Sequence, residues 1–360
     1  MRDDWDSIER GAAALDAMPN YERVVKLRCG AAIKPQPITW LWDGWLPAGK
    51  LTILAGAAGT GKTTLTLSLA ATLTAGGRWP DGKPAKAKGN VLIWSSEDNP
   101  DDTLVPRLIA AGADMSRCHF IEGIAENGQS VPFDPSQDIG ELHKAVERIG
   151  GVSLLIIDPI VSAVAGDMHR ANDVRRSLQA VVDFAEVHKC AVVGITHFAK
   201  GGAGKSPQER VIGSQAFGAL ARMVLVAAKE EDGDRRVLAR AKSNIAPDDG
   251  GVSYCLDLVN IGGGMEATRT RWEGVIEGTA REILGDVEYN EDNEAEERAD
   301  AEQFLRGLLA DGPMPSKAVK ADADGAGYSW ATIRRAQRVI GVECVKEKGS
   351  KTSHWVWRLP

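Results

Sequence analysis

One stretch near the start of the chain restricts the possible folds more than any other. Residues 56–63 fit the pattern G-x-x-x-x-G-K-[ST] at every fixed position, with a short apolar run at 52–55 before them and leucines at helical spacing after them. A strand, a glycine-rich loop and a helix in this order predict a nest of backbone N–H groups, reinforced by the positive end of the helix dipole. Such a nest binds phosphate, so we expect this region to bind a nucleoside triphosphate.

The residue types in this loop predict its ligands. The Lys62 ammonium can reach the β- and γ-phosphates, and the Thr63 hydroxyl can hold Mg²⁺. We therefore expect ATP and Mg²⁺ to bind here. The residues expected at the phosphate site are Gly56, Ala57, Ala58, Gly59, Thr60, Gly61, Lys62, Thr63 and Thr64.

Two later apolar runs each lead to a carboxylate. The run at 90–94 is followed by Glu97 and Asp98, and the run at 152–157 ends at Asp158. Ligands of open α/β sheets bind beyond the carboxyl ends of the strands, so we expect these side chains beside the phosphate loop. Glu97 is the candidate general base that activates the attacking water, and Asp158 is the candidate carboxylate of the Mg²⁺ shell. Asp98 could support Glu97 or cap the next helix.

A third polar strand end is His197, which follows the apolar run at 191–196. Its imidazole could sense the γ-phosphate and relay its loss to the following loop, or it could be a hydrogen-bonded structural histidine. That loop carries Lys200, Lys205 and Arg210, which are candidates for contacting the backbone of single-stranded DNA. A solvated loop without a partner is the alternative.

Other stretches are less specific. Arg222, Arg240 and Lys242 are expected near strand ends, where a cation can complete a neighbouring subunit's site as an arginine finger or pair within its own subunit. The three tryptophans within residues 40–45 could stack on bases, but we favour an apolar segment packed on the sheet, because tryptophan is mostly a core residue. Residues 122–138, with Gly, Asn, Ser and two prolines, are expected to form a connecting loop.

Composition restricts the class of protein. The 360 residues are 43% hydrophobic and 26% charged, which is typical of a globular protein with about two domains. The net charge of −7 provides no overall basic surface, so any nucleic-acid binding must come from local patches. Five scattered cysteines without a C-x-x-C pair, no signal peptide and no run of membrane-helix length favour a cytoplasmic location without membrane attachment.

Changes in composition predict four segments. They are an N-terminal arm at 1–35, a core at 36–285, an acidic linker at 286–300 and a C-terminal domain at 301–360. The last segment contains ten Lys/Arg and six Asp/Glu, so its net charge is +4. Its three expected helices and β-hairpin resemble a winged helix-turn-helix, with Arg334, Arg335 and Arg338 on the third helix. That helix is a candidate for contacting duplex DNA, and docking to a protein is the alternative.

Several segments in this order resemble a known family. The loop at 56–63, the segment 95–98, the strand 154–158 and the segment 195–197 look like the RecA-type ATPases, and most like the plasmid RepA-type hexameric helicases. The resemblance implies a twisted, mostly parallel sheet flanked by helices, a ring of subunits and ATP sites between neighbours. By motif position it implies phosphate and Mg²⁺ contacts for Lys62, Thr63 and Asp158, the base for Glu97, the sensor for His197, and the finger for Arg222, with Arg240 and Lys242 as rivals.

Three functions fit these patterns. The first is a ring-forming, DNA-dependent ATPase, a helicase or translocase that acts on single-stranded DNA during DNA replication. The second is a RecA-like recombinase or single-strand annealing ATPase, which would form filaments. The third is an ATP-sensing DNA-binding regulator, and Glu97 argues against it because a switch needs no base to activate water.

Overall fold

The computed structural model divides the chain into two compact units, Met1–Pro37 and Ile38–Pro360. It describes residues 27, 29–126, 128–164, 171–198, 215–230, 233–288, 295–310, 312–326, 328, 330–346 and 355–360. In the first unit these residues include a short 3₁₀ helix, η1 (Gly30–Ala32), and the exposed side chains of Leu27 and Ile33. Most of the predicted N-terminal arm lies outside the described residues, and the four predicted segment boundaries stay predictions.

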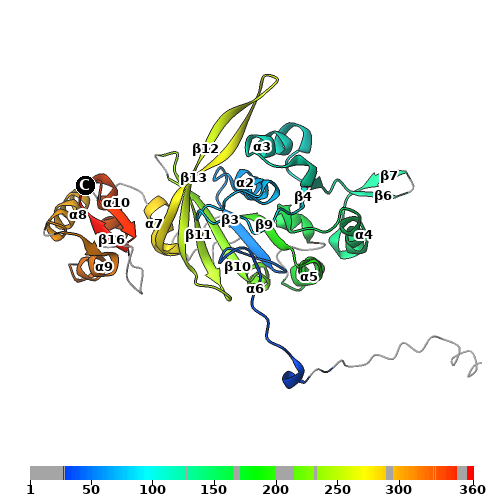
Figure 1. Ribbon diagram of the computed structural model, residues 1–360, viewed down its shortest axis with the longest axis horizontal. Coiled ribbons are helices and arrows are strands. Elements are labelled where there is room, and N and C mark those ends of the chain that lie inside the picture. Colours follow the sequence, from blue (N-terminus) through cyan, green and yellow to red (C-terminus); the bar gives the residue numbers. More distant parts are fainter. Residues whose placement is uncertain are drawn as a thin grey trace, which may run out of the picture. The chain divides into compact units, whose positions relative to one another are not determined.

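A nine-stranded sheet forms the centre of the described part of the second unit (Figure 1). The strand order is β13-β12-β11-β10-β3-β9-β8-β4-β5. Neighbours are parallel from β10 to β5 and antiparallel from β10 to β13, so the predicted mostly parallel α/β fold is confirmed. The strands are β3 (Leu51–Gly56), β4 (Val91–Ser95), β5 (Cys118–Phe120), β8 (Leu154–Asp158), β9 (Ala191–His197), β10 (Met223–Lys229), β11 (Arg236–Ser243), β12 (Asp249–Gly262) and β13 (Met265–Thr279).

Helices cover both faces of this sheet. One face packs against α2 and α3, and the other packs against α4, α5, α6 and α7. Because both faces are covered, the central strands need apolar side chains on both sides, and β8 is buried at every position down to Asp158. The bounds are α2 (Lys62–Ala75), η2 (Pro100–Leu104), α3 (Val105–Ala110), η3 (Met115–Arg117), α4 (Pro135–Arg148), η4 (Ile160–Ala163), α5 (Ala171–His188), α6 (Gln215–Leu220) and α7 (Ala280–Glu288).

Strands β12 and β13 form a long antiparallel ribbon. Their pairing runs from Asp249 opposite Thr279 to Gly262 opposite Met265, and the turn falls on the glycines at 262–264. The ribbon contacts α2 and α3 (Figure 1), and the Thr270 N–H donates to the Ser68 hydroxyl of α2 at 3.3 Å. A segment distant in sequence therefore covers the helix that follows the phosphate loop.

The prediction that residues 122–138 form a connecting loop is wrong. The structure has a hairpin of β6 (Ile124–Glu126) and β7 (Gln129–Val131), and α4 already begins at Pro135. The Asp134 carboxylate caps α4 by accepting from the Ser136 N–H at 2.8 Å, and proline suits a first helical position because its missing N–H would be unpaired there. One of the two prolines that suggested a loop, Pro135, is thus the first residue of a helix.

The tryptophans near residue 40 belong to the core. In β1 (Trp40–Trp42) and the segment before β2 (Leu46–Pro47), Trp42 and Trp45 are buried. Their ring centroids lie 4.6 Å apart, and Trp79 stacks on Trp42 at 5.8 Å. Trp42 and Trp45 therefore cannot stack on bases, and the prediction of an apolar segment packed on the sheet is confirmed.

The C-terminal residues have a hydrophobic cluster of their own around Trp357. Ion pairs from Lys320 to Glu282 and from Arg338 to Glu230, the latter at 3.4 Å, join this part to the core. Its elements are α8 (Ala295–Leu308), β14 (Met314–Pro315), α9 (Ser316–Gly325), α10 (Trp330–Val339), β15 (Glu343–Lys346) and β16 (Trp355–Arg358). These elements are compatible with a winged helix, which stays a prediction. Among the residues that the structure describes, no helix combines the length and apolarity needed to cross a membrane.

Candidate functional site

The phosphate loop connects β3 to α2 at the carboxyl end of a central strand. A Cβ at Gly56 would lie 2.3 Å from the Ala227 carbonyl oxygen of β10, and Gly61 has φ +80°, so both positions require glycine. The Thr60 hydroxyl donates to the Ala57 carbonyl at 3.0 Å and closes the loop. Of the other expected loop residues, the exposed ones are Ala57, Ala58 and Gly59, and the buried ones are Thr60, Lys62 and Thr64.

The Lys62 ammonium lies inside the loop. It donates to the carbonyl oxygens of Gly56 and Ala57 at 3.0 and 2.9 Å, and it lies 3.3 Å from Nδ1 of His197. Burial lowers the pKa of Lys62, while the charges of Asp158 and Glu97 act in the opposite direction. A cation bonded only to neutral groups in a loop of backbone amides suits a phosphate ligand.

Thr63 and Asp158 meet beside Lys62. The Thr63 hydroxyl donates to Oδ2 of Asp158 at 2.6 Å, which joins the start of α2 to the end of β8. Burial raises the pKa of Asp158 to about 6, although the bond from Thr63 favours the charged form. A hydroxyl and a carboxylate are hard oxygen donors, so this pair fits Mg²⁺.

His197 and Glu97 complete this group. An ammonium can only donate, so we assign Nδ1 of His197 as the acceptor from Lys62 and place the ring proton on Nε2. Burial lowers the pKa of His197, the charge of Lys62 lowers it further, and the charge of Glu97 acts in the opposite direction. Glu97 is exposed on the turn after β4, near enough for its charge to act on the Lys62, Asp158 and His197 pKa values.

Contacts on both sides hold the turn that carries Glu97. On one side of it, the Ser96 N–H donates to the Asp158 carbonyl at 3.0 Å. On the other side, the Asp98 carboxylate pairs with Arg107 of α3 at 3.0 Å, and both side chains are about two-thirds buried. The cap of the next helical segment is Asn99, which accepts from the Asp101 N–H, so Asp98 is free to support the turn.

The three expected finger residues lie on or next to β10 and β11, at different distances from the phosphate loop. Strand β10 runs parallel to β3 and pairs Met223 with Thr52, so Arg222 lies at the amino end of β3, and its N–H donates to the Leu51 carbonyl at 3.0 Å. Strand β11 runs antiparallel to β10 and pairs Lys242 with Val224 and Arg240 with Leu225, so both lie along the strands rather than at the amino end. Arg222 is therefore the one of the three that lies at the end of β10 opposite the phosphate loop.

Arg222 and Arg240 differ in their surroundings. Arg222 is exposed, and no described residue forms an ion pair with it. The Arg240 guanidinium lies 4.8 Å from the Trp45 ring centroid, donates to the Gly44 carbonyl at 3.3 Å and lies 3.9 Å from the Asp249 carboxylate. Arg240 is thus committed to contacts within its own chain, while Arg222 is exposed.

The expected nucleic-acid contacts are only partly described. Lys200, Lys205 and Arg210 lie outside the described residues. Arg334, Arg335 and Arg338 lie on α10 as expected. The Arg334 guanidinium is 5.9 Å from the Trp357 ring centroid, Arg335 is half-buried, and Arg338 pairs with Glu230 of the core.

Sequence reasoning missed Tyr254 and Arg107. Tyr254 of β12 donates its hydroxyl to the Thr60 carbonyl of the phosphate loop at 2.8 Å. Alternate apolar positions in β12 indicate a buried face, but no sequence pattern reveals which loop that face covers. Arg107 gave no signal, because a single arginine on a helix is usually solvated.

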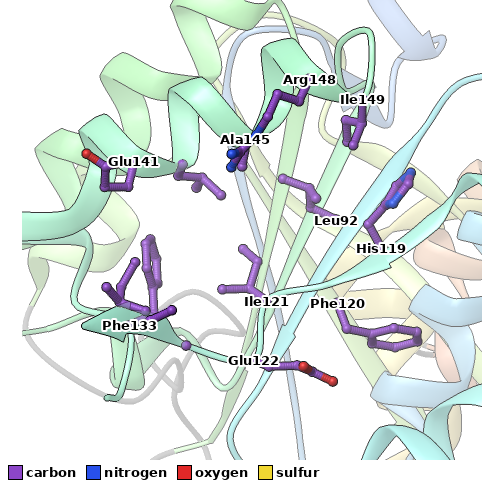
Figure 2. Close-up of a pocket in the computed structure, with 14 residues that line it drawn as sticks. Leu92, His119, Phe120, Ile121, Glu122, Phe133, Glu141, Ala145, Arg148 and Ile149 are labelled. Atoms are coloured by element: carbon purple, nitrogen blue, oxygen red, sulfur yellow. The ribbon is translucent and has the colours of Figure 1, made fainter. Parts of the chain in front are cut away.

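Two hollows lie beside the edge strand β5, apart from the phosphate loop. One, of about 600 Å³, lies between β5 and α4 and combines apolar Leu92, Ile121 and Phe133 with Glu122 and Arg148 (Figure 2). The other, of about 650 Å³, lies beyond the carboxyl end of β4 and includes Ser96 of the turn that carries Glu97. Neither is lined by residues of the phosphate loop, so neither is the expected triphosphate site.

Comparisons with known proteins identify the family of this chain. The sequence profile of an AAA domain (AAA_25) matches residues 21–203, which include the phosphate loop, Glu97, Asp158 and His197. Among solved structures, the crystal structure of the RadB recombinase is similar, with a TM-score of 0.42 and 19% identity over 59% of this chain and 89% of that chain. No curated protein matches the chain.

Proposed function

Because this chain belongs to the AAA_25 family of AAA domains, we propose that it is an ATPase that couples ATP hydrolysis to movement on DNA. The proposed form is a ring of identical subunits that acts as a helicase or translocase of the RepA type in DNA replication. Its substrates are ATP and single-stranded DNA.

The observation that carries the proposal is the joined group at the carboxyl edge of the sheet. Residues from the start of α2, the turn after β4, and the ends of β8 and β9 meet there, with Lys62 near His197 and Thr63 bonded to Asp158. A phosphate-binding loop alone would suit any nucleotide-binding protein. The addition of a carboxylate at the end of β8 and an exposed Glu97 on the adjacent turn supports hydrolysis rather than binding alone.

The residues of this chain suit the steps of hydrolysis. Thr63 and Asp158 would hold Mg²⁺, which when bound supplies charge neutralisation at the β- and γ-phosphates. Lys62 moves from the carbonyls of Gly56 and Ala57 to the phosphates, because phosphate oxygens are stronger acceptors for an ammonium than neutral carbonyls. Glu97 orients the attacking water and accepts its proton.

His197 provides a way to report this event. Its Nδ1 atom accepts from Lys62, so a Lys62 that turns to the γ-phosphate leaves His197 without that bond. The side chain then changes its partner at the end of β9, directly before residues 199–214. We propose that Lys200, Lys205 and Arg210 of that segment contact single-stranded DNA and respond to this change.

The position of Arg222 supports a head-to-tail assembly of subunits, of which the proposed ring is the closed form. An exposed cation at the sheet edge opposite the phosphate loop cannot serve the loop of its own chain, and it can serve the loop of a neighbour in a head-to-tail assembly. Of the three candidate fingers, Arg222 is therefore the one we propose. The C-terminal part, with Arg334, Arg335 and Arg338 on α10, is proposed to bind duplex DNA.

The test is the ATP turnover of wild type and Glu97→Gln, with and without single-stranded DNA, at a stated salt concentration. We expect DNA to stimulate the wild type and the substitution to lower turnover by at least about 100-fold, because the general base is lost. Glu126→Gln, an exposed carboxylate of β6, is the matched control and should retain full turnover. Turnover that ignores single-stranded DNA would refute the motor.

Assembly separates the proposed motor from the other DNA-dependent candidates. Electron microscopy with nucleotide should reveal closed rings, whereas filaments on single-stranded DNA would indicate a recombinase or annealing protein. Slow turnover with tight, sequence-selective duplex binding would indicate an ATP-sensing regulator.

A further inference from the structure

Two residues of β12 contact the phosphate loop from outside. Tyr254 is fully buried, and its hydroxyl donates to the Thr60 carbonyl at 2.8 Å, across 194 positions of the sequence. Leu256, two residues further along the same face, lies against Gly61, where an added Cβ would be 2.7 Å from Cδ1 of the leucine. The ribbon therefore supports the loop at the peptide bond between Thr60 and Gly61.

This contact determines which way that peptide faces. The peptide bond is planar, and its C=O and N–H point in opposite directions when it is trans, as it is here. Since the Thr60 carbonyl points to the Tyr254 hydroxyl, the Gly61 N–H points away from β12. Gly61 lies in the left-handed region with φ +80° at the start of α2, where backbone N–H groups bind anions.

We propose that Tyr254 is a positioning residue for nucleotide binding, which fixes the Thr60–Gly61 peptide so that the Gly61 N–H faces the phosphates. The inference rests on the proposed function, because it takes a nucleoside triphosphate as the ligand of the loop. Leu256 assists by filling the space next to Gly61, which keeps the peptide from turning.

The surroundings of Tyr254 suit a fixed donor. Its ring lies beside Trp272 of β13, with centroids 5.7 Å apart, and the Thr270 N–H anchors the same strand to Ser68 of α2. In register, Tyr254 faces the buried Arg236 of β11. Burial raises the pKa of Tyr254, and the positive charge of Arg236 acts in the opposite direction, so the phenol keeps its proton.

The experiment compares wild type with Tyr254→Phe, which removes one hydroxyl and keeps the ring. We would titrate ATP and, separately, pyrophosphate as a probe that has no base or sugar. The dissociation constants of both should rise by the same factor, about three- to tenfold, since one hydrogen bond is lost from the loop that holds the phosphates. Leu256→Ala should act in the same direction.

Tyr328→Phe is the matched control, because Tyr328 lies beside Phe304 in the C-terminal cluster. It should leave both constants unchanged. The thermal shift that ATP induces should shrink for Tyr254→Phe and not for Tyr328→Phe. Because each shift is measured against the variant's own unliganded midpoint, a general loss of stability does not affect the comparison.

The outcomes separate this inference from the proposed function. If wild type binds ATP and Tyr254→Phe binds it equally well, Tyr254 does not position the loop, whether or not the variant melts earlier. If wild type binds neither ATP nor pyrophosphate, the proposed function fails, and the positioning role fails with it.

Discussion

The carboxyl ends and the amino ends of the central parallel strands have different surroundings. At the carboxyl ends of the parallel strands, the first residues of α2 bond to strand-end side chains, as Lys62 does to His197 and Thr63 does to Asp158. Elsewhere on the sheet, Arg240 is committed to Trp45 and Gly44, while Arg222 is exposed at the amino end of β10. One end therefore groups the side chains of the proposed ATP site, and the other leaves one cation, Arg222, exposed.

This difference indicates how one sheet could contribute residues to two ATP sites of the proposed assembly. A phosphoryl-transfer site gains from a cation that arrives from another subunit, because hydrolysis then depends on assembly. Arg222 lies at the amino end of β10 and is exposed, so it is available for the contact with a neighbouring subunit that we propose.

The largest expected effect is that of Arg222→Gln. If Arg222 completes the neighbour's site, turnover should fall by about 10³-fold, because loss of an arginine finger removes stabilisation of the transition state. ATP binding to the loop should change little. Steady-state turnover and a nucleotide titration check this together, and a variant that turns over normally would contradict the proposed role of Arg222.

His197→Ala should have the next largest effect on turnover. Alanine removes the Nδ1 acceptor that lies 3.3 Å from the Lys62 ammonium. We expect the stimulation of turnover by single-stranded DNA to fall by about tenfold, while the basal rate falls less, because His197 relays rather than reacts. Equal losses with and without DNA would make His197 part of the hydrolytic site instead.

Arg107→Gln should lower turnover by a few fold. The change removes the pair with Asp98 and leaves the Glu97 turn less well held, and a misplaced base is a poorer base. The exchanged pair, Asp98→Arg with Arg107→Asp, should recover part of the loss. If the exchanged variant has a normal melting temperature but regains no turnover, the ion pair between Asp98 and Arg107 does not position Glu97.

Arg240→Gln should have the smallest effect on turnover and a measurable effect on stability. Loss of the contact with the Trp45 ring and the bond to Gly44 should lower the free energy of unfolding by about 1–2 kcal/mol. Denaturant unfolding checks this value. A drop in turnover as large as that of Arg222→Gln, in a stable variant, would transfer the finger to Arg240.

Much of the carboxyl edge could be predicted from the sequence. Each of its residues follows a buried apolar run or belongs to a fixed pattern, so position along the chain predicts position in the sheet. The contacts from β12 could not be predicted, because the distance from Tyr254 to Thr60 depends on how a long ribbon packs over α2. The same holds for the contact of Arg240 with Trp45, because it depends on how segments distant in sequence pack together. Trp45 stacks on Trp42, which also stacks on Trp79.

The most direct test of the account mixes two inactive variants. Arg222→Gln subunits keep Glu97, and Glu97→Gln subunits keep Arg222, so in a head-to-tail ring about a quarter of randomly mixed interfaces contain both groups. We predict that the equal mixture regains ATP turnover well above either variant alone. Co-purification of two different tags verifies that mixed assemblies form. If these assemblies stay as inactive as the two single variants, the site is not shared between neighbours.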